Sequence, residues 1–283
     1  MSGRARGEVI AALLVVALFC AVVGPVWWQR WRDGDLAGRP APSPSATTAS
    51  PSGSSAPPSA TRRQGTVVRI SDGDTLSVKL SGRSTTVRIL NIDTPETKKA
   101  GTPVECLGPQ ASAALAELLP VGSSVELEHD GRRTDRYGRT LAVVYRDGRM
   151  IGAEMARRGL TAGVVVNGAD TFLGPVAAAQ HEAMQAQRGL YDPNIGCTLA
   201  GQVEQRVRDL AVEPASTAQQ EAARAQRLKS AIGSAQQLRA TLALPDSQHK
   251  STLRYRYPAG WRYGQVKRLD TALATARQAV ASK

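Results

Sequence analysis

Cysteine is scarce in this chain of 283 residues, which contains three, at Cys20, Cys106 and Cys197. So few cysteines exclude a domain held together by several disulfides and leave at most one internal bridge. Acidic residues are also in the minority, because 24 Asp and Glu accompany 36 Lys and Arg, for a formal net charge of +12. A basic chain is attracted to nucleic acid or to an anionic membrane surface, and charge alone does not separate these two partners.

Charged residues are absent from the segment 9–28. An apolar run of this length can cross the hydrocarbon core of a bilayer as a helix, and Trp27 and Trp28 end it where interfacial aromatic residues are favoured. Because no small-x-small cleavage site follows directly, we expect an uncleaved transmembrane anchor, with an export signal as the alternative. Residues 1–8 are then the expected cytoplasmic N-terminus.

Large apolar side chains are nearly absent from the next stretch, residues 36–62, which is rich in Pro, Ser, Ala and Thr. Such a composition cannot bury a core and predicts a disordered linker. A tether between an anchor and a folded domain suits the outer side of a membrane. We therefore expect the rest of the chain to be membrane-anchored and extracytoplasmic, or secreted if the N-terminal segment is removed. Arginines on both sides of the segment leave its orientation weakly defined.

Carboxylates and arginines gather in three short motifs, which are Ser71-Asp-Gly-Asp-Thr75, Arg88 with Asp93-Thr-Pro-Glu96, and Asp135-Arg-Tyr-Gly-Arg139. Carboxylate oxygens are ligands for a hard cation, and arginine forks match the oxygens of a phosphate. The motifs contain no His or Cys, so their chemistry favours Ca²⁺ over zinc. An isolated Asp-Gly-Asp is often only a turn. The three motifs in order predict cleavage of a phosphodiester.

A metal site is predicted within the first two motifs. Asp74 and Asp93 are the expected direct ligands, and the backbone carbonyl of Thr94 supplies a third oxygen. Asp72 is expected to support the site without contacting the ion directly. The predicted cofactor is Ca²⁺.

Three further side chains are candidates for catalysis. Arg88 and Arg139 can each present a planar fork to phosphate oxygens as charge develops in the transition state. Glu96 follows Pro95, whose ring restricts the loop and aims the carboxylate. The alternative for all three is an ordinary solvated surface charge.

In their order and spacing, these motifs resemble the thermonuclease family, the calcium-dependent nucleases typified by staphylococcal nuclease. The resemblance runs from about residue 66 to residue 191. It implies the same metal ligands, a water activated by Glu96, and a nucleotide lying against Tyr137 with its neighbour Arg136; the alternative for Tyr137 is packing within the fold. Typical members carry two tyrosines that flank the base, where this chain has Val165 and Asn167, so base preference is expected to be altered.

The fold class predicted for residues 63–199 is α+β. Strands are expected where β-branched residues alternate between turn signals, at 66–71, 75–80, 85–91, 125–128 and 141–145. Helices are expected at 110–119, 150–158 and 176–188. The resemblance implies that these elements form a five-stranded OB-fold β-barrel with three helices.

The resemblance ends near Leu199, and residues 200–283 are rich in Ala, Gln and Arg. Few Gly or Pro interrupt them, which predicts a basic helical extension with helices at 204–210, 217–244 and 266–280. Between the last two, Arg254 to Tyr263 alternate basic and aromatic residues. This stretch is either an exposed hairpin that contacts nucleic acid, or a small aromatic core packed with the helices.

Two cysteines remain outside the apolar segment. If the domain is exported, Cys106 and Cys197 are expected to form a disulfide, and the alternative is that both are reduced.

The sequence therefore predicts a calcium-dependent nuclease acting on DNA, RNA or both, held at a membrane by its N-terminal helix, with no protein partner inferred. The alternative is a tethered OB-fold module that binds nucleic acid without cutting it. The presence of Arg88, Glu96 and Arg139 together favours the enzyme.

Overall fold

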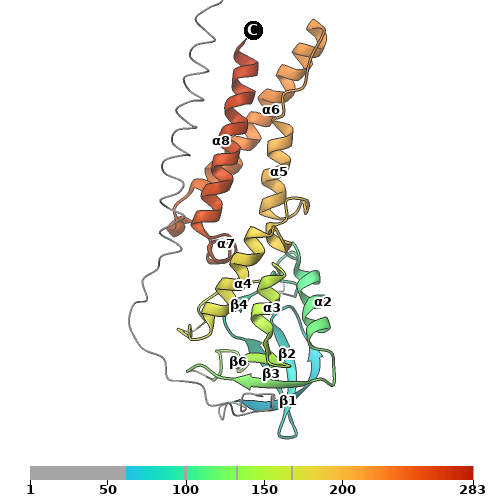
Figure 1. Ribbon diagram of the computed structural model, residues 1–283, viewed down its shortest axis with the longest axis vertical. Coiled ribbons are helices and arrows are strands. Elements are labelled where there is room, and N and C mark those ends of the chain that lie inside the picture. Colours follow the sequence, from blue (N-terminus) through green and yellow to red (C-terminus); the bar gives the residue numbers. More distant parts are fainter. Residues whose placement is uncertain (1–61, 99–100, 132, 167, 283) are drawn as a thin grey trace, which may run out of the picture. The chain divides into compact units, whose positions relative to one another are not determined.

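The computed structural model describes residues 62–98, 101–131, 133–166 and 168–282 (Figure 1). All of them belong to one compact unit. The predicted membrane segment 9–28, the linker up to residue 61 and Asn167 lie outside the described residues. Among the helices within these ranges, none has the length and apolarity needed to cross a membrane.

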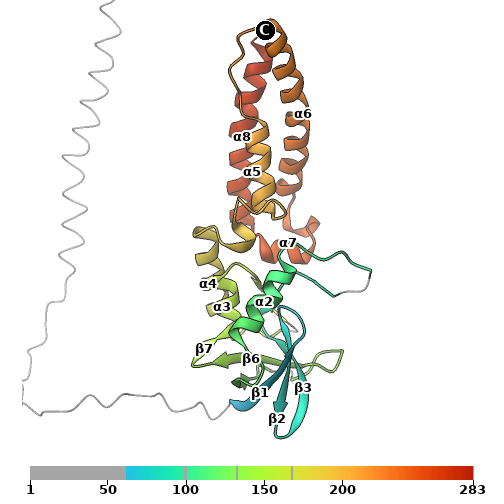
Figure 2. The same cartoon turned by 90° about the vertical axis from the view of Figure 1, so that its right-hand side faces the viewer.

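A closed β-barrel forms the first half of the described chain (Figure 2). Its spatial order is β3-β2-β1-β5-β6, with antiparallel neighbours, and a parallel pairing of β3 with β6 closes it. The five strands are β1 (Arg63–Ile70), β2 (Thr75–Leu80), β3 (Arg83–Ile89), β5 (Ser124–Glu128) and β6 (Thr140–Arg146). This is the five-stranded OB-type barrel that the sequence predicted.

Three pairs of residues form additional short strands that the sequence did not predict. They are β4 (Ile92–Asp93), β7 (Arg149–Met150) and β8 (Ala162–Gly163). β7 extends the sheet beyond β6, and β4 pairs with β8. Two residues are too few to show an alternating pattern, so such strands depend on their partners.

Alternating side chains of the strands fill the barrel. Val67, Val78, Val87 and Ile89 are buried in one core, because every second residue of a strand faces the same side. The three predicted helices are present as α2 (Gly108–Leu118), α3 (Ile151–Arg157) and α4 (Leu173–Gln185). Leu115 of α2 and Val176 of α4 are part of the same core.

Helix α4 lies about one turn earlier in the sequence than predicted. It begins at Leu173, with Pro175 inside its first turn, where a missing N–H costs nothing. It ends at Gln185 rather than near Gly189. Gly189 has φ 57° and lies against the backbone of Gly159, where an added Cβ would come within 2.4 Å of a carbonyl oxygen. This glycine therefore permits a close backbone contact and does not mark the helix end.

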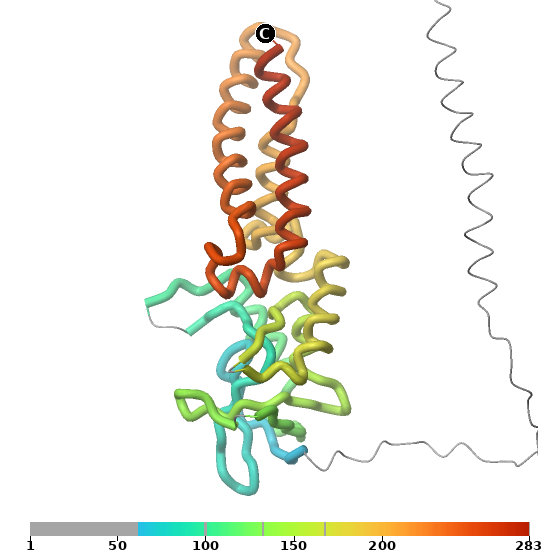
Figure 3. Tube along the Cα trace, turned by 90° about the vertical axis from the view of Figure 1, so that its left-hand side faces the viewer, coloured from blue at the N-terminus to red at the C-terminus, as the bar shows by residue number. Residues whose placement is uncertain are grey.

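The predicted helical extension is present. Its elements, with the short turn that precedes it, are η1 (Gly189–Tyr191), α5 (Leu199–Asp209), α6 (Ala218–Ala243), η2 (Asp246–Gln248), α7 (Ser251–Arg256) and α8 (Ala259–Ala281). Figure 3 shows α5, α6 and α8 running alongside one another. Leu228 of α6 and Leu269 of α8 are fully buried between them. Thr217 begins α6 with a capping box, in which its side chain and that of Gln220 each accept a backbone N–H.

Of the two alternatives for Arg254–Tyr263, the hairpin is absent, since α7 ends at Arg256 and α8 begins at Ala259. Pro258 stands at the N-cap of α8, a position that tolerates a residue without a backbone N–H. Tyr257 and Trp261 instead pack against Tyr191, with ring centroids 5.9 and 6.0 Å away. The aromatic-core interpretation is correct for these two side chains, and the core they join also includes residues of the barrel region.

A disulfide connects Cys106, just before α2, to Cys197, just before α5. The two Cα atoms are 5.7 Å apart across a sequence separation of 91 residues. The bridge fastens the start of the helical extension to the barrel region.

Removal of this bridge is expected to destabilise the protein, because the unfolded chain regains the freedom of a long loop. Replacing both cysteines with serine should lower the free energy of unfolding by about 2–5 kcal/mol. Urea denaturation followed by circular dichroism measures this loss, and Cys20→Ser serves as the control that keeps the bridge. Equal unfolding midpoints for the double variant and the control would contradict the expectation.

Candidate active site

A polar cavity of about 220 Å³ collects most of the residues that the motifs singled out. Its lining consists of Asp72, Asp74, Arg88, Asp93, Thr94, Pro95, Glu96 and Arg139. Strand pairing brings these motifs together. Thr75 of β2 lies opposite Arg88 of β3, and the parallel pairing of β3 with β6 brings Arg139, which immediately precedes β6, to the same region.

The side chain of Arg88 joins the two carboxylates predicted to bind metal. Its Nη2 lies 3.1 Å from Asp74 Oδ2 and 3.8 Å from Asp93 Oδ1. Its Nη1 donates a hydrogen bond of 2.6 Å to the carbonyl of Ile89. Both carboxylates are thus within reach of a single nitrogen, and the guanidinium balances their mutual repulsion.

Asp74 is held in place by neighbouring donors. Its Oδ2 accepts hydrogen bonds from the Thr94 backbone N–H at 3.3 Å and the Thr94 hydroxyl at 3.0 Å. Its backbone N–H donates to Asp72 Oδ1 at 3.1 Å, so Asp72 supports the turn. Between them, an added Cβ on Gly73 would approach Thr94 to 2.8 Å, and this close packing requires glycine.

Burial raises the pKa of two of these carboxyls, Asp72 and Asp93. Burial raises the pKa of Asp72, and the nearby charge of Asp74 raises it further. Burial also raises the pKa of Asp93, whereas the guanidinium groups of Arg256 and Arg88 oppose this rise. A cation in the cavity would favour the ionised form of both carboxyls.

Glu96 lies on the loop after β4, in a defined orientation. Its Oε1 accepts hydrogen bonds from the backbone N–H groups of Thr97 at 2.9 Å and Lys98 at 2.8 Å. The Glu96 backbone donates in turn to Glu105 Oε2 at 2.9 Å and accepts from the Glu105 N–H at 2.8 Å. These bonds fix the loop that carries the proposed base.

Asp135 organises the third motif. It accepts hydrogen bonds from the backbone N–H groups of Tyr137 and Arg139 at 2.9 and 3.0 Å, and from Arg139 Nε at 2.7 Å. Burial opposes ionisation of Asp135, but these hydrogen bonds prevail and lower its pKa. Gly138 has φ 76°, which lets the chain turn back within the motif. The guanidinium of Arg139 is thereby anchored at the cavity wall.

Tyr137 and Arg136 lie outside the lining of the cavity, on the adjacent loop. Tyr137 is 68% exposed, so it does not pack within the fold. The guanidinium carbons of Arg136 and Arg139 lie 4.8 and 5.5 Å from its ring centroid. An exposed ring of this kind is available for stacking on a base. Val165, which replaces one of the expected tyrosines, is also exposed.

Arg256, the last residue of α7, was not among the predicted site residues. Its Nη2 donates to Asp93 Oδ2 at 3.3 Å and to the Thr94 carbonyl at 3.0 Å, while its Nη1 donates to Glu105 Oε2 at 2.7 Å. The Tyr191 hydroxyl donates to the Arg256 carbonyl at 2.8 Å and so fixes the end of α7. The alternation of Arg and Tyr indicated a basic contact here, but sequence contained no sign of the partner.

The donors in the cavity fit a hard cation. Asp74 and Asp93 line the cavity with carboxylate oxygens, as Ca²⁺ prefers. The Thr94 carbonyl accepts a hydrogen bond from Arg256, and its second lone pair is the one that would be left for an ion. Within the described ranges, no three His, Cys, Asp or Glu side chains are grouped so as to hold a metal ion. Protein coordination at this cavity would therefore combine two carboxylates with a backbone carbonyl, and water would complete the shell.

Known nucleases resemble part of this chain. Residues 86–192 match the family described as Staphylococcal nuclease homologue. The thermonuclease of Staphylococcus hyicus is 34% identical over 125 residues, which cover 44% of this chain and 73% of the relative. The thermonuclease of Staphylococcus intermedius is 35% identical over 126 residues, with 44% and 74% covered. The chain belongs to the thermonuclease family.

A further family relative is endonuclease YncB of Bacillus subtilis. It is 45% identical over 96 residues, which cover 34% of this chain and 45% of the relative. The family match ends at residue 192, so Arg256 comes from beyond the matched region.

Loss of Arg256 is expected to loosen the loop of Asp93 and Thr94. Arg256→Ala leaves Asp93 and Glu105 without this cation in a partly buried place, and should lower the free energy of unfolding by about 1–3 kcal/mol. Lysine at this position should restore only part of the loss, because a single ammonium cannot span both carboxylates as the fork does. Urea denaturation measures both variants, and Arg277→Ala on the exposed face of α8 is the control. A loss no larger than that of the control would show that these contacts do not hold the loop.

Proposed function

We propose that this thermonuclease-family chain is a calcium-dependent nuclease that hydrolyses phosphodiester bonds in DNA, RNA or both. One observation carries the proposal. A single cavity joins two carboxylates and a carbonyl suited to a hard cation with two arginines and a fixed glutamate. Hydrolysis at phosphorus requires this combination of positive charge and an oriented water.

Each residue has a distinct part in the proposed reaction. Asp74, Asp93 and the Thr94 carbonyl would hold Ca²⁺, which would supply positive charge to position the scissile phosphate. Glu96 orients the attacking water and accepts its proton. Its hydrogen bonds to the loop backbone hold the carboxylate in one direction before substrate arrives.

The two arginines act on the charge that develops at phosphorus. Asp135 anchors Arg139 through Nε, and Arg88 reaches the cavity from the end of β3. Two forks fixed in one cavity can bind the equatorial oxygens more strongly in the transition state than in the ground state. Beside them, Tyr137 and Arg136 offer an exposed ring and a charge to the adjoining nucleotide.

The proposed location is the outer side of a membrane, with residues 9–28 as the anchor, or secretion if that segment is removed. The Cys106–Cys197 disulfide supports this proposal, because such bridges persist in oxidising compartments.

The first test concerns the metal. The full chain should cleave plasmid DNA in Ca²⁺ and lose this activity in excess calcium chelator, because oxygen donors alone hold the ion. Asp93→Asn should raise the Ca²⁺ concentration needed for half-maximal cleavage, and calorimetry should show weaker Ca²⁺ binding. Asp147→Asn, an exposed carboxylate outside the cavity, is the control. Full activity in chelator would exclude the proposed cofactor.

The second test separates catalysis from binding. Arg139→Ala should lower kcat by about a hundredfold or more, the scale for loss of one transition-state donor. Glu96→Gln keeps the shape of the side chain and should remove activity through the loss of the base. Arg149→Ala, an exposed arginine of β7, is the control. An unchanged kcat for Arg139→Ala would exclude Arg139 from the transition state. A wild-type chain that bound nucleic acid but did not cleave it in Ca²⁺ would favour the binding-module hypothesis.

A further inference from the structure

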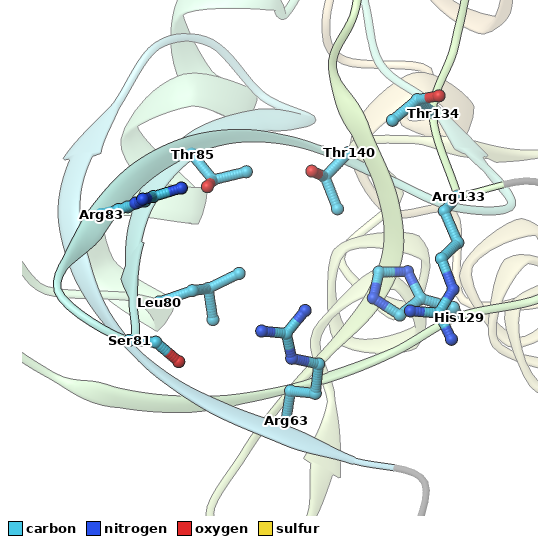
Figure 4. A pocket seen from close by; sticks show the side chains of 9 residues that line it. All are labelled: Arg63, Leu80, Ser81, Arg83, Thr85, His129, Arg133, Thr134 and Thr140. Atoms are coloured by element: carbon cyan, nitrogen blue, oxygen red, sulfur yellow. The ribbon is translucent and has the colours of Figure 1, made fainter.

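A second cavity, of about 500 Å³, lies at one end of the barrel. Figure 4 shows three arginines around it, Arg63 from β1, Arg83 from β3 and Arg133 from the segment before β6. Leu80, at the end of β2, is part of the barrel core and closes the inner side. We call this space the basic cavity.

The charge of the basic cavity is uncompensated within the described part of the chain. No acidic residue is among the described residues that line it. The three arginines form no ion pair and no side-chain hydrogen bond with other described residues. The neighbouring Arg62 behaves differently, because it pairs with Glu126 at 3.1 Å and Glu128 at 3.0 Å.

Three acidic residues nearby have other partners. Glu126 and Glu128 of β5 are the ones that Arg62 engages. Asp130 accepts a hydrogen bond of 3.0 Å from the backbone of Thr171. Three cations that remain unpaired around one hollow repel each other, and an anion would relieve that repulsion.

Hydrogen-bond donors complete the lining. Hydroxyl groups come from Ser81, Thr85, Thr134 and Thr140. The ring of His129 is held by a hydrogen bond of 2.7 Å between Nδ1 and the Leu141 carbonyl. Arginine forks and hydroxyl groups are the side chains that contact phosphate oxygens in nucleic-acid complexes, so the ligand chemistry that fits is a phosphate.

The basic cavity and the active site share the seam between β3 and β6. Thr140 of the basic cavity directly follows Arg139 of the active site. On β3, Thr85 and Arg83 lie three and five positions from Arg88, which is about 10–17 Å along a strand. Thr85 and Arg83 are on the same face of β3 as Val87, which belongs to the barrel core, whereas Arg88 is on the opposite face. A substrate strand would therefore pass around the edge of the barrel.

We propose that the basic cavity is a second phosphate-binding site, which takes a backbone phosphate of the nucleic-acid substrate outside the nucleotides held at the active site. The inference rests on the proposed nuclease function. For a strand of duplex DNA, which rises about 3.4 Å per nucleotide, the separation along β3 corresponds to about three to five nucleotides, and an extended single strand would span it with fewer. A short substrate would occupy the active site alone, and a longer one would reach both sites.

Two triple variants of the full chain test this site. The cavity variant is Arg63→Ala with Arg83→Ala and Arg133→Ala. The control variant is Arg69→Ala with Lys79→Ala and Arg149→Ala, which removes the same charge from exposed positions that do not line the basic cavity. Binding of a fluorescent single-stranded 20-mer and of a dinucleotide is measured by anisotropy in calcium chelator, at several salt concentrations.

Each phosphate contact contributes about 0.7 to the slope of log affinity against log salt for a single strand. If each of the three arginines contacts one phosphate, the slope measured with the 20-mer should be smaller by about 2 for the cavity variant than for the wild-type chain. The control variant should keep the wild-type slope. Dinucleotide affinity and kcat on a short substrate should be unchanged. A variant with lysine at all three cavity positions should keep most of the wild-type slope, because the salt dependence of binding depends on charge. Thermal melting checks that each variant is folded.

Equal slopes for the cavity and control variants would overturn the proposal, as would a loss that is equally large for the dinucleotide. A cavity variant that loses only its sedimentation with phosphatidylglycerol vesicles would assign the arginines to lipid phosphates and also overturn it. Because the slopes are read in chelator, they do not depend on cleavage. The slopes thus report whether the second site exists, and the plasmid assay reports separately whether the chain is a nuclease.

Discussion

Repulsion between Asp74 and Asp93 is the constraint around which the cavity is built. Two carboxylates that share a space of about 220 Å³ repel each other, and burial together with the charge of Asp74 raises the pKa of Asp93, so nearby cations are needed to keep the pair ionised. Arg88 reaches both of them, and Arg256 reaches Asp93 from the opposite end of the chain. The carboxylates of this cavity suit a hard cation, and the arginines that balance their charge suit a phosphate.

The helical extension takes part in this balance of charge. Arg256 donates to the carbonyl of Thr94 and to Asp93, two of the three predicted metal ligands. Gln180 and Tyr191 support it from the barrel region, because Gln180 Nε2 donates to the Tyr255 carbonyl at 2.8 Å and the Tyr191 hydroxyl donates to the Arg256 carbonyl. Burial raises the pKa of Tyr191, so its hydroxyl stays protonated and remains a donor. The extension is thus coupled to the loop that would bind metal.

Arginine has different roles in different parts of this thermonuclease-family fold. At the active site its forks are held by carboxylates and directed into a small cavity. In the helical extension it forms ion pairs such as Arg239 with Asp270, whose exposed setting makes a small contribution to stability. At the basic cavity it has no partner among the described residues, which leaves its charge available to a ligand. The net charge of +12 alone does not distinguish these uses.

Local patterns were sufficient for much of the fold and of the cavity. β2 lies at Thr75–Leu80 as predicted, because β-branched and apolar residues between two turns leave few alternatives. Asp74, Arg88, Asp93, Glu96 and Arg139 were recognisable because they lie in three short motifs whose order and spacing, taken together, resemble a known family. The Cys106–Cys197 disulfide was expected on the assumption that the domain is exported, because these two cysteines are the ones outside the apolar segment, and the structure contains it. Contacts between distant segments had no such local signal.

Tertiary structure alone decided the rest. Arg256 meets Asp93 across 163 residues of sequence, and the packing of Tyr257 on Tyr191, rather than any local pattern, holds α7 at that position. The basic cavity likewise gathers Arg63, Arg83 and Arg133 from three separate segments. Sequence by itself determined which side chains can do the chemistry, since that depends on residue type and near neighbours. Which of these side chains lie in the same cavity depends on how the barrel closes and where the helices pack. Closure and packing result from many contacts between distant segments, which no short segment encodes.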